Sequence, residues 1–405
     1  MRFRSRRLGS LRCGLLALVL LPGAAGADIA DGVGFRVGDL RVSLNRGIRY
    51  RPHEDVVLRV GGRLHLDFYD FDDDVLQLGS NNFDIRRARV FGKLELFRDW
   101  KIMVDRELSN YHIDRRGWRN LWLEYSGIRR LELRAGNQTA PMGMEDLQSS
   151  NDTTFMERSL AATFTPSFLD GAMARYSGRR NWSVAGGVFF DPVGGAKDDP
   201  RSAEGVGFVG RAAWAPWYDH EERQLIHVAA SFEYRDIDKE LRYRSRPESG
   251  GARRLVDTGT IRNVDDLVTV GGELGGVWGP VSLRGEFLRA QVFRSGPNLA
   301  YQGGFASVSW IVTGESVRYN PRSGVFGEVR PKHDFGAIEL AARYSAIDLD
   351  DENVRGGRER DWTLGLNWYL TRNIRAMVNH VWVRARDRGV EDRPRILQFR
   401  IQFAI

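Results

Sequence analysis

The sequence predicts an all-β fold, a transmembrane antiparallel β-barrel of about 16 strands. Two observations lead to this prediction: apolar and polar residues alternate along many short segments, and short connections alternate with long ones. Side chains point to opposite faces along a strand, so a barrel wall needs lipid-facing apolar residues between water-facing polar residues. The sequence shows no comparable stretch with the 3.6-residue period of an amphipathic helix.

The last ten residues, 396–405, show the alternation most clearly. Apolar side chains at every second position from Leu397 to Ile405 share one face, whereas Gln398, Arg400 and Gln402 share the other. One face is therefore apolar and the other polar, as in a strand between lipid and a water-filled interior. We expect this strand to close the barrel against the first strand, near residue 58.

Sixteen segments carry such a pattern. They begin near residues 58, 84, 100, 119, 131, 170, 182, 206, 225, 268, 281, 305, 336, 362, 374 and 396. Short connections follow the second, fourth and sixth segments, and long connections lie near residues 69–83, 138–169, 236–267 and 345–361. Bacterial barrels alternate short periplasmic turns with long external loops in this way. One connection, residues 313–335, is longer than this rule predicts.

Tryptophans lie near the ends of the predicted strands. They are Trp100, Trp118, Trp214, Trp278, Trp362 and Trp368. Indole rings favour the boundary between lipid and water, so we expect these side chains to form the aromatic girdles of the barrel.

The N-terminus predicts export of the chain. Four arginines within the first seven residues precede an apolar run at residues 15–21, and Ala25-Gly26-Ala27 provides a cleavage site. The apolar run is shorter than the about 20 residues that a transmembrane helix needs. We therefore expect a cleaved signal peptide over residues 1–27, an N-terminal periplasmic segment or extra strand over 28–55, and an outer-membrane barrel domain over 56–405.

Composition limits the kinds of site. The only cysteine, Cys13, lies in the expected signal peptide, which argues against disulfides, zinc–thiolate sites and cysteine catalysis. Removing the five arginines of that segment leaves 55 (60 − 5) basic against 53 acidic residues, so the net charge falls from +7 to +2 and indicates no nucleic-acid partner. We expect no metal, no cofactor and no enzymatic activity. The catalytic alternative is a Ser–His pair assembled across strands, for instance Ser231 with His227.

Several specific motifs accompany this pattern. The connection after the fifth segment, near residues 138–169, is the third external connection, and we call it the third long loop. It and its flanks contain residues 136–142 (GNQTAPM), 145–147 (EDL) and 149–160 (SSNDTTFMERSL). Other motifs are residues 86–89 (RRAR), residues 121–125 (LWLEY), Thr313-Gly314-Glu315 with Tyr319, and residues 364–369 (LGLNWY). In sequence and in order, these motifs resemble those of the phosphate-selective porin O and P family.

The resemblance implies a trimeric outer-membrane channel whose third loop folds inward and narrows the pore, and in which basic side chains conduct phosphate or polyphosphate. The implied constriction loop comprises Ser149, Ser150, Asn151, Phe155, Met156, Glu157 and Arg158. For Glu157 and Arg158, a salt bridge that fixes the inward loop is the structural alternative to a direct role in the pore.

Basic residues on the water-facing side of the predicted strands are candidates for the anion path. They are Arg59, Arg63, Arg87, Arg89, Lys93 and Arg134. Guanidinium groups offer forked donors that match phosphate oxygens, and a row of moderate sites lets an ion both enter and leave. Ion pairs of Arg87 and Arg89 with Glu95 or Glu124 are the structural alternative.

These observations predict an outer-membrane porin of a Gram-negative bacterium, a passive diffusion channel that prefers anions. We expect it to pass phosphate, polyphosphate or similar oxyanions, to form a homotrimer, and to contact outer-membrane lipid and lipopolysaccharide. Two alternatives stay open. One is a non-selective general-diffusion porin, and the other is a non-conducting barrel that acts as a surface receptor or adhesin.

Overall fold

The structure is a computed structural model that describes residues 34–37, 40–43, 47–72, 75, 78–79, 82–109, 117–193, 205–221, 223–387 and 389–405. The expected signal peptide, residues 1–27, lies outside the described residues. Within the described ranges, no helix is long and apolar enough to cross a membrane.

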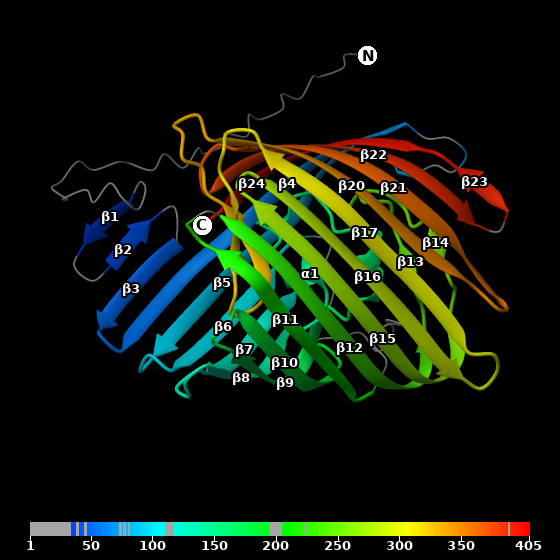
Figure 1. Cartoon of the computed structure of the whole chain (residues 1–405), viewed down its shortest axis with the longest axis horizontal. Helices are drawn as coiled ribbons and strands as arrows, with labels where there is room; N and C mark the ends of the chain where they lie inside the picture. Colours follow the sequence, from blue (N-terminus) through cyan, green and yellow to red (C-terminus); the bar gives the residue numbers. More distant parts are fainter. Residues whose placement is uncertain are drawn as a thin grey trace, which may run out of the picture.

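Sixteen strands of the described chain form the wall of a closed antiparallel barrel (Figure 1). In chain order they are β4 (Val56–Asp72), β5 (Asn82–Leu96), β6 (Trp100–Glu107), β7 (Trp118–Tyr125), β8 (Leu131–Thr139), β9 (Phe168–Ser177), β10 (Trp182–Phe190), β11 (Gly207–Asp219), β12 (Gln224–Leu241), β15 (Ile261–Trp278), β16 (Val281–Arg294), β17 (Leu299–Ile311), β20 (Ala337–Asp351), β21 (Val354–Tyr369), β22 (Ile374–Asp387) and β24 (Arg395–Ala404). The short strand β23 (Val390–Asp392) pairs with the end of β22. The last strand, β24, pairs with the first, β4, with Phe399 opposite Phe68. The predicted fold class and the closing role of the last strand are confirmed.

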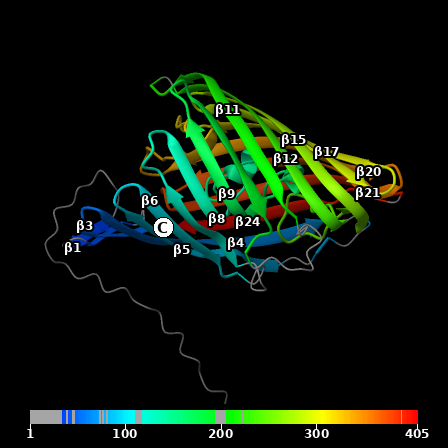
Figure 2. The same cartoon turned by 90° about the horizontal axis from the view of Figure 1, so that it is seen from below.

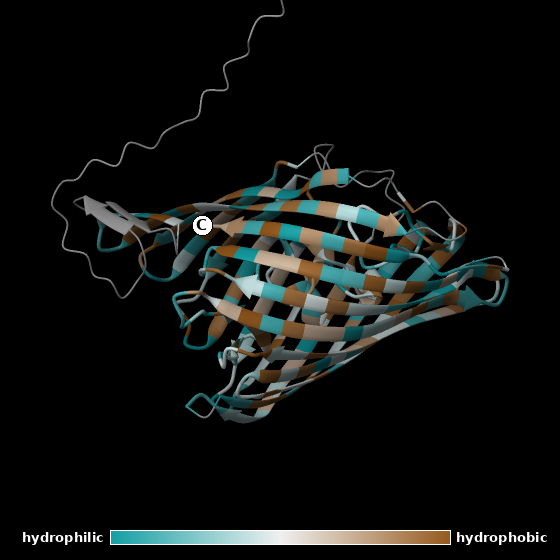
Figure 3. Cartoon of the chain, turned by 90° about the horizontal axis from the view of Figure 1, so that it is seen from above, coloured by the Kyte–Doolittle hydropathy of each residue, from teal (hydrophilic) through white to brown (hydrophobic). Residues whose placement is uncertain are grey.

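Side chains alternate between the two faces of the wall, which Figure 3 shows as alternating colours along the strands. On β21, Trp362, Leu364 and Trp368 are exposed on the outside, whereas Thr363 and Asn367 are buried inside. Exposed apolar side chains of this kind form a surface that suits lipid, and the buried polar ones face the interior.

The wall is taller on one side than the sequence predicts. The predicted long loop at residues 345–361 is replaced by continuous strands, because β20 and β21 run through this stretch and leave a turn of only two residues. The two-residue alternation of inward and outward side chains continues through this stretch, as Ile347 and Leu349 show: both point inward and are 3% and 0% exposed. Likewise, β12 and β15 extend until only residues 242–260 connect them, with the short strands β13 (Arg244–Ser245) and β14 (Val256–Asp257) in that loop.

Three connections fold into the barrel and fill much of its interior. The third long loop, residues 140–167, carries α1 (Met144–Leu147) and the 3-10 helix η3 (Leu160–Phe164), and Figure 1 shows α1 inside the barrel. Residues 242–260 pack beside it. From the opposite end, residues 312–336 turn inward as a hairpin of β18 (Val317–Asn320) and β19 (Val325–Val329), which explains the long connection there. Apolar side chains of all three segments, including Phe164, Tyr243 and Phe326, belong to one buried cluster.

Three short strands precede the barrel. They are β1 (Gly34–Val37), β2 (Leu40–Ser43) and β3 (Gly47–His53), and β3 pairs with the first residues of β4. Because β24 pairs with β4 only from Arg63 onward, β3 continues the sheet where β24 ends. A Cβ atom on Gly61 would lie 2.3 Å from the carbonyl oxygen of Ile405, which explains a glycine at this junction. Figure 2 shows these strands projecting beyond the barrel beside the C-terminus.

Candidate functional site

The third long loop divides the interior of the barrel. The backbone N–H of Met156 donates to Asn379 Oδ1 on β22 at 2.8 Å. Asn367 on β21 donates through Nδ2 to the carbonyl oxygen of Thr154 at 2.9 Å. Helix η3 packs against β16, β17 and β20. These contacts fix the loop against the tall part of the wall.

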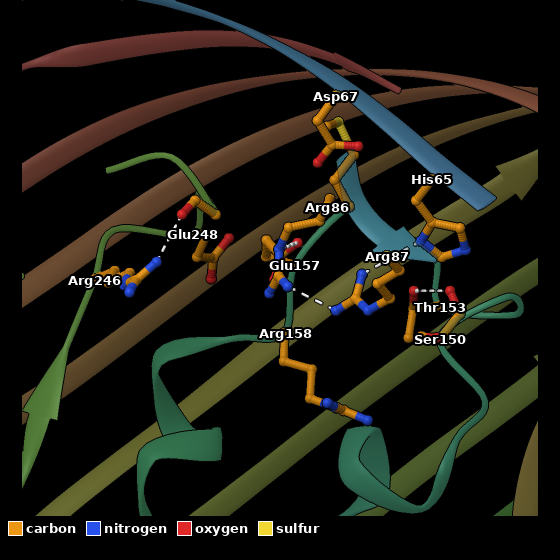
Figure 4. Close-up of polar contacts among 12 residues, drawn as sticks. His65, Asp67, Arg86, Arg87, Ser150, Thr153, Glu157, Arg158, Arg246 and Glu248 are labelled. Carbon is orange, nitrogen blue, oxygen red and sulfur yellow. Dashed lines mark hydrogen bonds and ion pairs between the residues drawn. The ribbon is translucent and has the colours of Figure 1, made fainter. Parts of the chain in front are cut away.

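Glu157 anchors this loop. Arg86 donates through Nε and Nη2 to the two carboxylate oxygens at 3.0 and 2.7 Å, and Arg400 donates through Nη2 at 2.8 Å. Arg87 Nη2 lies 3.6 Å from the same carboxylate, and Figure 4 shows Arg86 and Arg87 converging on it. Burial alone would raise the pKa of Glu157, but the charges of these three arginines hold its pKa well below the ordinary value. Glu157 is thus an ionised structural carboxylate.

Arg158 uses different partners. Its side chain points away from Glu157 in Figure 4, its Nε lies 3.2 Å from Asp146 Oδ1, and it donates to the carbonyl oxygen of Glu145 at 3.0 Å. Glu157 and Arg158 therefore do not pair with each other, but each forms an ion pair of the loop-fixing kind that the sequence suggested as the structural alternative. Both residues hold the loop in place, each through a separate ion pair.

The tip of the loop faces β4. Ser150 Oγ accepts a hydrogen bond from Arg63 Nη1 at 3.0 Å, and Asn151 Oδ1 lies 3.2 Å from His65 Nε2. Ser149 is exposed. Two residues of the predicted constriction loop, Ser150 and Asn151, thus lie against the inner face of β4.

Phe155 and Met156 are buried between the third loop and the barrel wall. They are 2% and 1% exposed, and the guanidinium of Arg343 lies 4.3 Å from the centre of the Phe155 ring. Arg343 Nη1 pairs with Glu145 of the same loop at 2.8 Å, and its Nε donates to Glu248 of residues 242–260 at 3.0 Å. One arginine on β20 thereby ties two inward-folded loops together.

Four basic residues form two rungs on β4 and β5. Arg59 lies directly opposite Lys93, and Arg63 lies directly opposite Arg89. All four point into the barrel, and Arg63 contacts the tip of the third loop through Ser150. Like charges directly opposite one another destabilise a sheet, so this arrangement favours the approach of an anion. We refer to these four residues as the basic ladder.

The basic ladder has fewer carboxylates than basic groups. Glu95 pairs with Lys93 at 2.9 Å, and Glu107 pairs with Arg89 at 2.6 Å. Arg63 makes no ion pair within the described ranges, and its buried Nε has no hydrogen-bond partner. Counting only direct ion-pair partners, the four basic groups have two carboxylates, which leaves an excess of two positive charges (4 − 2).

Arg87, a predicted path residue, lies in the loop anchor. Its side chain is 6% exposed, with Nη1 3.4 Å from His65 Nδ1 and Nη2 3.6 Å from Glu157. For Arg87 the predicted ion pair with Glu95 or Glu124 is wrong, because the carboxylate beside it is that of Glu157. A loop residue far away in the sequence could not be identified as the partner from strand periodicity.

Arg134, another predicted path residue, belongs to a row of ion pairs across β6 to β9. It donates through Nε to Glu124 at 3.0 Å, and Lys101 Nζ approaches the same carboxylate at 2.7 Å. On the next pair of strands, Arg175 Nη1 lies 3.0 Å from Glu132. Each of these three basic groups has an ion-pair partner, although two of them share Glu124, whereas Arg63 of the basic ladder has none.

The inward hairpin of residues 312–336 makes contacts that the sequence did not indicate. Arg211 on β11 donates to the carbonyl oxygens of Ser323 and Gly324 at 3.0 and 2.9 Å. The guanidinium of Arg284 lies 4.5 Å from the centre of the Phe326 ring. These contacts hold the hairpin inside the barrel at the end opposite the third loop.

The catalytic alternative does not assemble. His227 Nδ1 lies 2.8 Å from Tyr319 Oη and its Nε2 lies 3.3 Å from Glu273, whereas the buried Ser231 Oγ has no hydrogen-bond partner. Among the residues that the structure describes, no group of three or more His, Cys, Asp or Glu side chains is arranged to hold a metal ion.

The predicted aromatic girdle holds with one exception. Trp118 points inward, lines a cavity of about 290 Å³ and has the Arg106 guanidinium 4.8 Å from its ring. The other predicted girdle residues are exposed on the outer surface at 40–57%: Trp100, Trp214, Trp278, Trp362 and Trp368.

Comparison with known proteins agrees with this architecture. The chain is 26% identical over 422 residues to Porin O of Pseudomonas aeruginosa, and the match covers 93% of each protein. It is 29% identical over 266 residues to an uncharacterised protein of Caulobacter vibrioides, covering 60% of this chain and 52% of that protein.

Solved structures share the fold. OmpT of Vibrio cholerae, an outer-membrane protein in trimer form, superposes with a TM-score of 0.54 at 10% identity over 87% of this chain and 100% of that chain. An anion-selective porin from Comamonas acidovorans gives a TM-score of 0.51 at 14% identity over 87% of this chain and 100% of that chain. The family model of phosphate-selective porin O and P matches residues 58–405. The chain is therefore an integral outer-membrane porin and belongs to the phosphate-selective porin O and P family.

Proposed function

We propose that this porin is a passive channel that prefers anions and passes phosphate, polyphosphate or similar oxyanions along the basic ladder. The observation that carries the proposal is the environment of Arg63. It lies opposite Arg89, has no ion pair within the described residues, and keeps unused N–H donors beside the loop tip. Forked guanidinium donors of this kind match the oxygens of phosphate.

The two rungs suit conduction rather than tight binding. They are four residues apart on β4, about 13 Å along the strand at 3.3 Å per residue. In one rung Glu95 pairs with both Arg59 and Lys93, and in the other Glu107 pairs with Arg89 alone. Each rung is therefore only partly neutralised, and an anion can move from one to the next without being trapped.

We also propose a homotrimer in contact with outer-membrane lipid and lipopolysaccharide. Residues 1–27 would be a cleaved signal peptide, and residues 28–55 would lie at the periplasmic end. The names of two similar structures point the same way, since one is a trimer form and the other is called anion-selective. We propose no catalytic role.

The test is the zero-current potential of single channels in a planar bilayer under a KCl gradient, followed by addition of phosphate. We expect an anion-selective potential and a chloride current that phosphate reduces. Arg63→Gln should shift the potential toward cations and weaken the phosphate effect. Arg360→Gln is the matched control because Arg360 is exposed on the outer face of β21 and should change neither.

Two results would overturn the proposal in different ways. A cation-selective wild-type channel would refute the anion preference, and a chloride current unaffected by phosphate would refute phosphate binding. On β6 to β9 every named basic group is ion-paired, which favours a general-diffusion porin as the second candidate. A potential near zero would support it. A receptor or adhesin would show no conductance steps from purified heat-modifiable trimers.

A further inference from the structure

Four arginines gather on the outer face of the barrel, away from the channel. On β21 and β22, Arg358 lies opposite Arg386, and Arg360 lies opposite Arg384. All four side chains are exposed on the outside of the wall. Two consecutive rows of like charges on neighbouring strands repel one another unless an anion lies between them. We call these four residues the outer arginine patch.

Only half of the outer arginine patch is neutralised by the protein. Arg358 Nε lies 3.1 Å from Asp348, and Arg384 Nε lies 2.9 Å from Glu391. Arg360 and Arg386 make no hydrogen bond or ion pair with any residue that the structure describes. Their guanidinium donors are therefore available to a ligand on the outer surface.

The patch lies at the level of lipid headgroups. Directly below it, Tyr344, Trp362 and Trp382 stand side by side on β20, β21 and β22, and the Tyr344 and Trp362 rings are 5.0 Å apart. Aromatic rows of this kind mark the boundary between lipid and water. On β21 the opposite boundary is Trp368, six residues further on, about 20 Å along the strand at 3.3 Å per residue. The patch is at the end that carries the third loop, which is the external end.

An apolar groove begins beside the patch. A cavity of about 460 Å³ lies on the wall over β16, β17 and β20, with Phe287 and Tyr344 at its sides and Arg358 and Arg360 at its rim. Its floor is low because Gly304 carries no side chain there, and a Cβ atom would lie 2.9 Å from the Glu286 carbonyl oxygen. Hydrocarbon fits such a floor, and a charged headgroup fits such a rim.

We propose that the outer arginine patch and this groove form a binding site for a phosphorylated, multiply acylated lipid of the outer leaflet, the lipid A part of lipopolysaccharide. Arg360 and Arg386 donate to a phosphate group, and an acyl chain lies in the groove beside Phe287. The aromatic row supports the headgroup from below. The site faces lipid and is separate from the conducting path, so it holds whether or not the channel prefers anions.

The test uses the full-length refolded protein in detergent, with diphosphorylated lipid A as the probe and binding followed by native mass spectrometry. We expect the double variant Arg360→Gln with Arg386→Gln to lose roughly 30-fold in affinity, since each arginine near a charged lipid surface contributes about a factor of five. Arg262→Gln is the control: it is also exposed but lies outside the patch, paired with Glu240. Binding should persist in EDTA, because guanidinium groups contact phosphate without a bridging cation.

Three results would overturn the proposal. They are equal affinity for lipid A and for phosphatidylethanolamine, equal loss in the control and the double variant, and full competition by 10 mM free phosphate. The double variant should keep its single-channel conductance and its oligomeric state. A change in oligomeric state would instead assign the patch to contact with another copy of the chain. Failure of anion selectivity with intact lipid A binding would leave this site standing.

Discussion

Replacement of Glu157 by glutamine should release the third loop from its anchor. Glutamine keeps the size of the side chain but removes the charge that three arginines share. Removing one partner of a buried ion pair costs about 3–5 kcal/mol. Here the lower end applies, because Arg400 keeps its bidentate contact with Asp67 at 2.6 Å. A cost of about 3 kcal/mol raises the population of the released loop roughly 100-fold.

Two measurements follow the released loop without requiring the barrel to unfold. Single-channel records of Glu157→Gln should show larger and noisier conductance, and trypsin should cut the folded protein within residues 140–167. A double-mutant cycle with Arg86→Gln sharpens the test, because Arg86 makes two of the hydrogen bonds to Glu157. The double variant should be less perturbed than the sum of the two single variants. Additive effects, or unchanged conductance and proteolysis in Glu157→Gln, would refute the anchor.

The same anchor sets a pH dependence. The pKa of Glu157 in the folded protein lies well below its ordinary value of 4.5, after burial, which raises it, is outweighed by the charges of Arg86, Arg87 and Arg400. A carboxyl with a lowered folded-state pKa stabilises the fold above its unfolded-state pKa and loses that contribution as the pH falls through the folded-state value. The wild-type loop should therefore stay anchored from neutral pH down to about 4.5 and loosen only in stronger acid. The loop of Glu157→Gln should show no such transition.

Three further predictions concern the passage and the wall. Burial, reinforced by the charge of Glu328, raises the pKa of Asp152 to about 6, so anion selectivity should increase as the pH falls through 6. An unchanged zero-current potential between pH 7 and 5 would contradict this prediction. The variant Asp152→Asn should abolish the pH-dependent change. Phe326→Ala should cost the inward hairpin about 3–5 kcal/mol and increase conductance, whereas Phe335→Ala, at an exposed position of the same connection, should not. Gly61→Val should lower the yield of folded, heat-modifiable barrel because β24 ends against it; a normal yield would show that the junction tolerates a side chain.

The sequence predicts the wall well because period-two alternation is a local property. All sixteen expected strand starts correspond to barrel strands, and the largest differences occur where a strand begins earlier, as for β15 and β21. In those extensions the outward face carries charged residues such as Arg262, Arg358 and Arg360, so the alternation of apolar outward and polar inward residues is lost. The inward hairpin at residues 312–336 was recognisable only as a connection of unusual length, since its partners lie far away in the sequence, on β11, β12 and β16.

The partners of the arginines could not be predicted in the same way. Strand period places Arg86, Arg87 and Arg400 near the interior, but it does not show that they meet at Glu157, which is 71 residues from Arg86 and 243 residues from Arg400. Position in a strand therefore separates inward from outward residues. It does not separate an arginine that anchors a loop from one that an anion can reach.

Burial makes that separation, and the choice between arginine and lysine follows it. Arg343 and Arg400 are each 1% exposed and contact several acceptors at once, carboxylates and backbone carbonyls together. A guanidinium has five donors in a planar fork, so one side chain satisfies all of these acceptors, whereas an ammonium group has three donors at a single point. Lys93 and Lys101 point into the lumen, and each side chain is 26% exposed. Where water or a passing ion supplies the remaining contacts, the compact charge of lysine is sufficient. The buried arginines are thus required by the folding of the loops, and the more exposed basic groups are the ones that we propose to act on the solute.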